Sequence, residues 1–175
     1  MGMVSVSNLK KTYGNVTAVD DISFDIEKGE IFGFLGPNGA GKTSTLNMMI
    51  GLSRPTAGEI AVDGIDVRRQ TKKAQAIMGI VPDESNLYNE MDGFDNLCFC
   101  AALYGMRKAE REPITRQLLE QFRLKDVGKR PFKAYSKGMR RKLTIAAALI
   151  HSPKVLFLDE PTTGIDVESS RQIRD

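Results

Sequence analysis

Residues 36–43 read GPNGAGKT, and this octapeptide decides how the rest of the chain is interpreted. It fits the pattern G-x-x-x-x-G-K-[ST], a phosphate-binding loop that lies between a strand and a helix. Residues 31–35 (IFGFL) precede it as an apolar run, and residues 42–50 (KTSTLNMMI) follow it with a helix-compatible composition. Strand, glycine-rich turn and helix start are the context that the motif requires, so we expect a P-loop here. A glycine turn that caps a helix and binds nothing is the alternative, and the Lys-Thr pair at the right offset argues against it.

The residue types of this loop suit the phosphates of a nucleotide. Glycines lack a Cβ, which lets the backbone curl around phosphates and point its N–H groups inward. The following helix would add unpaired amides and the positive end of its dipole. Lys42 would reach the β- and γ-phosphates of ATP, and the Thr43 hydroxyl would ligate Mg²⁺. The expected nucleotide-binding residues of the loop are Gly36, Pro37, Asn38, Gly39, Ala40, Gly41, Lys42, Thr43 and Ser44.

Length and composition are those of an ordinary globular chain. The 175 residues are 41% hydrophobic and 27% charged, which is enough for one real core. No apolar stretch is long enough to cross a bilayer, and the N-terminus lacks the apolar core of a secretion signal, so we expect a cytoplasmic protein. Cys98 and Cys100 stand two apart in a helix-like run, which favours half-buried thiols over a disulfide or a zinc site.

Basic side chains gather at residues 68–73 and 137–142, and the net charge is +3. Solvated helix faces are the preferred interpretation of both clusters, and a nucleotide, lipid head groups or nucleic acid are the alternative partners. The clusters lack the interleaved aromatic residues that bind single-stranded nucleic acid. No nucleic-acid partner is therefore expected.

The periodicity of the chain indicates strands first and helices later. Alternating apolar residues predict strands in the first third, and an apolar run ending in acid predicts a strand that is buried on both faces. Between them, apolar residues at helical spacing predict three helices in a compact segment. Parallel strands with crossover helices and a helical insertion give an α/β architecture. The expected strands are 3–9, 22–26, 31–35, 59–62, 77–81 and 154–159, with helical stretches at 67–76 and within 93–150.

Two carboxylates, Asp159 and Glu160, follow the apolar run at residues 155–158. In open α/β sheets, ligands bind at the carboxyl ends of the strands. We expect Asp159 to hold Mg²⁺ through water and Glu160 to take a proton from the attacking water as the catalytic base. Two solvated acids without a role are the alternative, which a P-loop in the same chain disfavours.

Four segments together resemble the ATP-binding-cassette family, the nucleotide-binding domains of ABC transporters. The resemblance spans nearly the whole chain, and it implies a P-loop NTPase core with a mostly parallel sheet, an N-terminal antiparallel β region and a helical subdomain. The expected parts of this one incomplete domain are a β region with the P-loop core at 1–92, a helical subdomain at 93–150, and an acidic strand that returns to the core at 151–175. The segments are LKKTYGNVTAVDDISFDIEKGE, GPNGAGKTSTLNMMIGLSRPTAGEI, YSKGMRRKL at 135–143 and LDEPTTGID at 158–166.

The resemblance also implies roles for residues outside the P-loop. Tyr13 would stack on adenine, while Ser136 and Gly138 would contact the γ-phosphate held by the P-loop of a second subunit. Two cassettes, as a homodimer or a paired ABC subunit, would close head-to-tail over two ATP molecules. They would drive an integral membrane permease from the inner face of the cell membrane. Ser136 taken alone supports only an N-cap of a plain helix.

The chain departs from the family pattern at three places. Asp83 stands where the family usually carries a Gln that senses Mg²⁺; a carboxylate there can still ligate the metal but adds negative charge. Lys137 stands where Gly is commonest, which favours an export system. The chain stops at Asp175 without the later strand and its γ-phosphate histidine, and His151 comes too early to replace it. We therefore expect a C-terminally truncated domain with an unpaired sheet edge that binds nucleotide and hydrolyses it poorly.

The predicted function is an ATP-binding subunit that hydrolyses MgATP to drive export through a permease. One alternative is a soluble ABC-type ATPase that acts on ribosomes or nucleic acid. The interval from Thr43 to Ser136 is compact and without heptads, which argues against the coiled-coil insertions of DNA-repair members. A second alternative is a binding-only module that is regulated by nucleotide occupancy.

Overall fold

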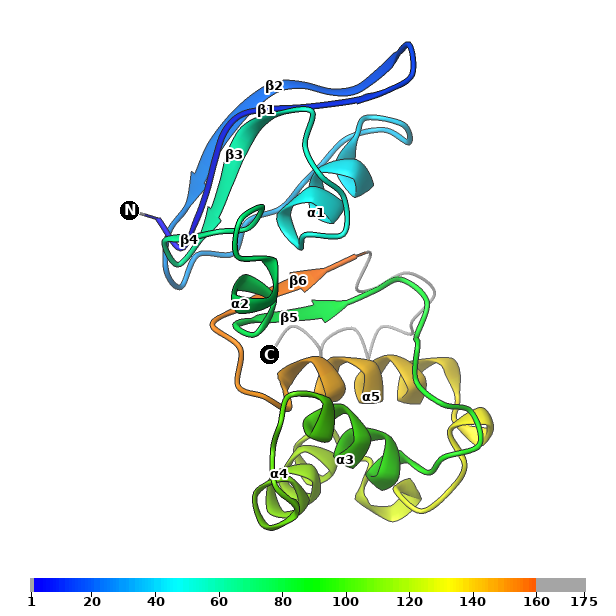
Figure 1. Ribbon diagram of the computed structural model, residues 1–175. Helices are drawn as coiled ribbons and strands as arrows, with labels where there is room; N and C mark the ends of the chain where they lie inside the picture. The colour runs from blue at the N-terminus through cyan, green and yellow to red at the C-terminus, as the bar shows by residue number, and fades with distance from the viewer. Residues whose placement is uncertain (1, 160–175) are drawn as a thin grey trace. The chain divides into compact units, whose positions relative to one another are not determined.

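A computed structural model of the protein describes residues 2–159 (Figure 1). The chain divides into two compact units, Met1–Met78 and Gly79–Asp175, and each is described by itself. Within the described residues, every helix falls short of the length and apolar character that crossing a bilayer demands.

A four-stranded antiparallel sheet forms most of the first unit, with the strand order β2-β1-β3-β4 (Figure 1). A tight hairpin joins β1 (Val4–Tyr13) to β2 (Val16–Ile26), and β3 (Ala57–Val62) turns back into β4 (Ile65–Asp66). Alternate apolar residues of β1 and β3 point to the same buried face, as the pleat of a strand dictates. The strands predicted from alternation in this unit are confirmed, and β1 and β2 are longer than the alternation indicated.

Two helices complete the first unit. In α1 (Lys42–Met49), the helix predicted after the P-loop, Met48 and Met49 are almost fully buried. The second helix, α2 (Thr71–Gln75), is shorter than the helical stretch predicted at 67–76. Its start is delayed because the Asp66 carboxylate accepts a hydrogen bond from the Arg69 backbone N–H (2.9 Å), which holds the preceding residues in a turn.

Residues 31–35 form no strand, contrary to the prediction. A run that is apolar at every position suits a strand with neighbours on both sides, and no described strand pairs with this segment. Phe32 and Phe34 pack their rings against Phe24 of β2, with centroids 5.2 and 5.3 Å away. Ile31 on the other side is 98% exposed. The segment is therefore irregular and is packed on one side only.

The second unit contains a two-stranded sheet of β5 (Met78–Val81) and β6 (Val155–Leu158), whose arrows run in the same direction in Figure 1. This pair is the part of the expected parallel sheet that the described residues contain. Phe157 is buried, but Leu158 is 39% exposed, so β6 is not covered on both faces as its apolar run predicted.

Three helices surround one apolar core in the second unit: α3 (Gly93–Leu103), α4 (Lys108–Gln121) and α5 (Lys137–Leu149). Short 3₁₀ turns η1 (Lys125–Val127) and η2 (Phe132–Ala134) connect α4 to α5. The predicted apolar stripes are confirmed, because their central members are buried together. The core consists of Leu87, Leu97, Ala101, Leu118, Leu119, Leu124, Phe132, Tyr135, Leu143, Ala146 and Ile150.

The two cysteines are half-buried free thiols on α3, as predicted. The Cys98 sulfur lies 3.5 Å from the Thr115 hydroxyl on α4. Burial raises the pKa of Cys100, which keeps its thiol protonated. Both thiols therefore behave as small packing groups between α3 and its neighbours.

Candidate nucleotide-binding site

The backbone of the predicted P-loop depends on glycine at two positions. Gly39 and Gly41 have φ values of 82° and 85°, in the left-handed region that favours glycine. Gly41 has a second constraint, because a Cβ there would lie 2.3 Å from the Ala18 carbonyl oxygen of β2. The loop is thus wedged against the sheet at the residue where α1 begins.

The first turn of α1 presents free donors. Gly41 is its N-cap and supplies no side-chain hydrogen bond, and the first turn carries no acidic residue. Residues 36–40 are exposed, and so is Thr43. Because the first amides of a helix have no intrahelical partner, this end of α1 can accept an anion.

The Lys42 ammonium lies over the loop. It donates to the carbonyl oxygens of Gly36 (2.7 Å) and Pro37 (2.8 Å). The Ala40 N–H also donates to the Pro37 carbonyl (3.3 Å), which closes the loop into a turn around Asn38. An ammonium has three donors, so one remains for a phosphate while two hold the loop.

Tyr13 ends β1 next to the same helix. Hydrogen bonding to the Ser53 hydroxyl, and then to the Ser44 hydroxyl of α1, lowers the pKa of Tyr13. Tyr13 is 51% exposed, and the Lys11 ammonium lies 4.8 Å from its ring centroid. The structure therefore brings Tyr13 beside the first turn of α1 and leaves a ring face accessible to a flat ligand.

A second exposed helix start is found at α5 in the other unit. Ser136 is the N-cap, and its hydroxyl accepts a hydrogen bond from the Met139 N–H (3.2 Å). Arg140 stabilises this start by donating to the carbonyl oxygens of Tyr135 (3.2 Å) and Lys133 (2.6 Å). Ser136 is exposed and Gly138 half-buried in a first turn that has no acidic residue. The start of α5 is therefore also suited to an anion.

The predicted metal ligands are partly described. Asp83 follows β5 and Asp159 follows β6, at the carboxyl ends of the two strands. The predicted base Glu160 lies outside the described residues. Within those residues no group of three or more His, Cys, Asp or Glu side chains could hold a metal ion. Mg²⁺ at a nucleotide site is usually bound by only one or two carboxylates together with phosphates, so the residues present fit that ion.

Arg141 is a residue that the sequence interpretation missed. It belongs to the basic cluster expected on a solvated helix face, but only 8% of it is exposed. Burial lowers the pKa of Arg141, and the carboxylates of Asp83 and Asp159 oppose that shift, so both acids lie near it. A signal was present: Ile145 and Ala148, four and seven residues further on, form a second apolar stripe that continues the face of Arg141.

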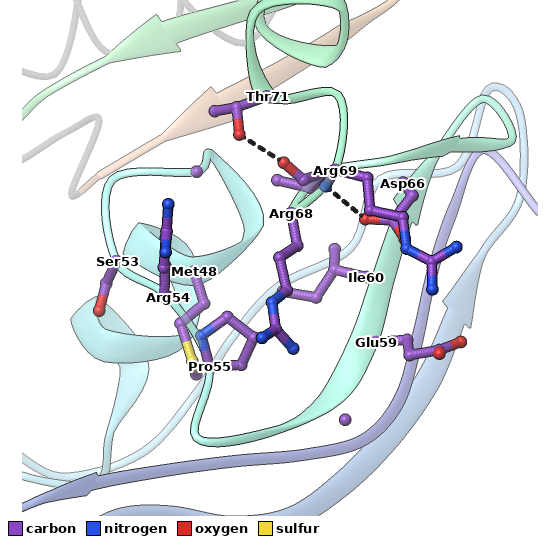
Figure 2. Close-up of a pocket in the computed structure, with 13 residues that line it drawn as sticks. Met48, Ser53, Arg54, Pro55, Glu59, Ile60, Asp66, Arg68, Arg69 and Thr71 are labelled. Atoms are coloured by element: carbon purple, nitrogen blue, oxygen red, sulfur yellow. Dashed lines mark hydrogen bonds and ion pairs between the residues drawn. The ribbon is translucent and has the colours of Figure 1, made fainter.

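A cavity of about 510 Å³ in the first unit is separate from these groups (Figure 2). It lies between the end of α1 and β3, and Met48 and Pro55 form part of its wall. Arg54, Arg68 and Arg69 also line it, and Figure 2 shows them around the hollow. None of its lining residues belongs to the P-loop, so it is not the nucleotide site.

Comparison with known proteins agrees with the motifs. A family model described as ABC transporter matches residues 19–163. The linearmycin resistance ATP-binding protein LnrL of Bacillus subtilis is 42% identical over 171 residues, which are 98% of this chain and 55% of that protein. Nod factor export ATP-binding protein I of Paraburkholderia xenovorans is 41% identical over 170 residues, 97% of this chain and 56% of that protein. The chain thus spans about half the length of these curated relatives.

Solved structures are similar over almost the whole chain. An ATP-binding subunit of an ABC transporter has a TM-score of 0.87 at 29% identity and covers 98% of this chain and 71% of its own. The ATP-binding cassette MJ0796, a dimer in a post-hydrolysis state with ADP and Pi, has a TM-score of 0.87 at 26% identity, with coverage of 98% and 79%. The expected P-loop NTPase fold is confirmed. The chain belongs to the ABC transporter family of ATP-binding proteins.

Proposed function

We propose that this chain is the nucleotide-binding part of an ABC export system, which binds and hydrolyses MgATP. The observation that carries the proposal is the start of α1, where a glycine N-cap leaves the helix amides free beneath the Lys42 ammonium. Relatives named for linearmycin resistance and for Nod factor export support the direction of transport.

Each candidate residue has a chemical role in this proposal. Lys42 and the amides of the loop hold the phosphate tail, and the Tyr13 ring stacks on adenine. Thr43, Asp159 and Asp83 would hold Mg²⁺, which neutralises charge on the phosphates when bound. Glu160 is proposed to orient and deprotonate the attacking water.

A second cassette completes the proposed site. Ser136 and Gly138, at the start of α5, would contact the γ-phosphate held by the P-loop of a second subunit. The dimeric solved structure with ADP and Pi supports this kind of assembly. Because the Ser136 hydroxyl accepts from the Met139 N–H, its own hydrogen remains free to donate to a phosphate oxygen.

The proposed membrane partner is a permease, with the cassette on its cytoplasmic side. Exposed apolar side chains on one unit support a protein contact. Tyr88 is 55% exposed and packs edge-on against Phe99 (centroids 5.2 Å). Leu103, the last residue of α3, is 71% exposed, and the C-cap residue Tyr104 is 45% exposed. Exposed apolar groups near the ends of one helix are candidates for such a contact.

A binding titration tests the proposal at Lys42. Lys42→Ala should weaken ATP binding about tenfold to a hundredfold, since a charged hydrogen bond to a phosphate contributes roughly 1.5–3 kcal/mol. Lys28→Ala, which removes an exposed lysine from a turn of the same unit, is the control and should leave the affinity unchanged. Calorimetry with ATP measures both. Equal affinity in the two variants would refute the assignment of the site.

The partner contact needs a separate test at Ser136. Ser136→Thr keeps both the cap and the free hydroxyl, whereas Ser136→Asp keeps the cap but places a carboxylate against the phosphate. ATP-dependent dimer formation, followed by light scattering, should survive in the first variant and be lost in the second. Dimers of equal strength in both variants would exclude Ser136 from the phosphate contact.

A further inference from the structure

The Arg141 guanidinium connects the carboxyl ends of two strands. It donates to the carbonyl oxygen of Asp159 after β6 (2.8 Å) and to that of Asp83 after β5 (3.3 Å). It also makes a short hydrogen bond to the Pro82 carbonyl oxygen. One side chain of α5 therefore holds the backbone at both predicted metal ligands.

Thr144, one turn further along α5, reinforces this connection. Its hydroxyl lies 2.8 Å from the hydroxyl of Ser85 and 2.9 Å from the Arg140 carbonyl oxygen. Only 3% of Thr144 is exposed. Arg141 and Thr144 thus fix the segment that carries Asp83 at two points along one face of α5.

The chemistry of the contact explains why an arginine occupies the position. A buried charge is unfavourable unless its donors are satisfied, and guanidinium offers five donors in a planar fork. Backbone carbonyl oxygens at the two strand ends accept hydrogen bonds from the guanidinium. An aliphatic side chain in its place could not donate to these carbonyls. Further along α5, Ile145 and Ala148 pack with Val81 of β5 and with the partly buried Leu156 of β6. The helix and both strands are therefore joined by apolar packing and by this polar link.

We propose that Arg141 is a positioning residue, which makes the placement of Asp83 and Asp159 follow the position of α5. The inference rests on the proposed function. Ser136 begins α5 five residues before Arg141, roughly 7–8 Å along the helix axis. Contact of a phosphate with the start of α5 would therefore set the two strand ends through a rigid helix, and Arg141 would act through the backbone that carries Asp83 and Asp159.

The test uses the effect of Mg²⁺ on ATP affinity rather than turnover. The dissociation constant of ATP is measured in EDTA and in Mg²⁺, and their ratio gives the Mg²⁺ effect for each variant. Arg141→Gln should reduce that ratio about tenfold, as expected for residues that orient metal ligands, and Arg141→Lys should restore part of it. Arg116→Gln is the matched control, because it removes a guanidinium of the same unit that holds an exposed ion pair with Glu112 on α4.

A milder variant addresses the case in which Arg141→Gln fails to fold. Thr144→Val removes only the hydroxyl contact and should lower the Mg²⁺ effect about two- to threefold, with Thr144→Ser as its control. Amide exchange of residues 83–85 in the absence of nucleotide should speed up in Arg141→Gln or Thr144→Val and stay unchanged in the controls.

The outcomes separate the inference from the function on which it depends. An unchanged Mg²⁺ effect in Arg141→Gln, or an equal loss in Arg116→Gln, overturns the inference while ATP binding stands. Where Arg141→Gln does not fold, an unchanged Mg²⁺ effect in Thr144→Val overturns it. Failure of the wild-type protein to bind ATP overturns the proposed function and the inference together.

Discussion

Replacement of Gly41 by alanine tests how the P-loop is held against the sheet. A Cβ at this position would lie 2.3 Å from the carbonyl oxygen of Ala18 and 3.1 Å from a methyl group of Val19. Contacts below 3.0 Å are essentially never seen for a Cβ, so the loop or β2 must move. Gly39→Ala is a natural control, because Gly39 has nearly the same φ and nothing within 4 Å of a built Cβ.

The two variants share one cost and differ in another. An alanine forced into the left-handed region loses about 1–2 kcal/mol, and this penalty applies to both positions. Gly41→Ala adds the strain of overpacking against β2, about 1–3 kcal/mol. We therefore expect a loss of about 1–2 kcal/mol for Gly39→Ala and about 2–5 kcal/mol for Gly41→Ala.

Urea unfolding of the nucleotide-free protein, followed by circular dichroism, measures the difference. Displacement of β2 would appear in addition as faster amide exchange at Ala18 and Val19. If Gly39→Ala and Gly41→Ala have the same free energy of unfolding and the same exchange rates, then the wedge between loop and sheet does not exist.

Three further changes probe the helical unit. Asn96→Ala removes a fully buried amide that bonds Tyr88 and the turn before α3, so unfolding in urea should become easier by about 1–3 kcal/mol. Leu97→Ala empties part of the core and should cost about 2–5 kcal/mol, whereas Leu103→Ala on the exposed side of the same helix should stay within about 0.5 kcal/mol; equal losses would contradict the packing. Hydrogen bonds from the Arg107 side chain lower the pKa of Glu110. Its stabilisation is therefore complete above the ordinary glutamate pKa and is lost as pH falls through the lower folded value. Glu110→Gln should therefore reduce the dependence of the free energy of unfolding on pH in the range where Glu110 becomes protonated. An unaltered pH dependence would argue against the contact between Arg107 and Glu110.

Local chemistry explains which parts of the fold were predictable. The helix after the P-loop, the glycines and the strands of the antiparallel sheet each follow from a short pattern whose physical cause lies within the pattern. The core stripe of α5 was equally clear, because Leu143, Ala146 and Ile150 recur at helical spacing and are fully buried. Ser136 was a predictable N-cap for the same reason.

The misses depend on neighbours that are distant in sequence. Residues 31–35 form a strand only where other strands pair with them, and the composition of the run carries no information on that pairing. Arg141 reads as one member of a basic cluster, because its carbonyl partners at Pro82 and Asp159 are 59 and 18 residues away. Asn96 likewise gains its importance from the turn that it closes.

The two exposed helix starts offer different things to a phosphate. At α1, the N-cap Gly41 has no side chain, so no amide of the first turn is taken by a cap and the Lys42 ammonium adds a full charge. At α5, the Met139 N–H already donates to the Ser136 hydroxyl, so fewer backbone donors remain. The hydroxyl hydrogen of Ser136 is the one side-chain donor that this N-cap adds. Binding energy should therefore come mainly from α1, while α5 adds a short-range contact that depends on where the last phosphate lies. An assembly of two such chains would then bind nucleotide first and close only over a complete triphosphate.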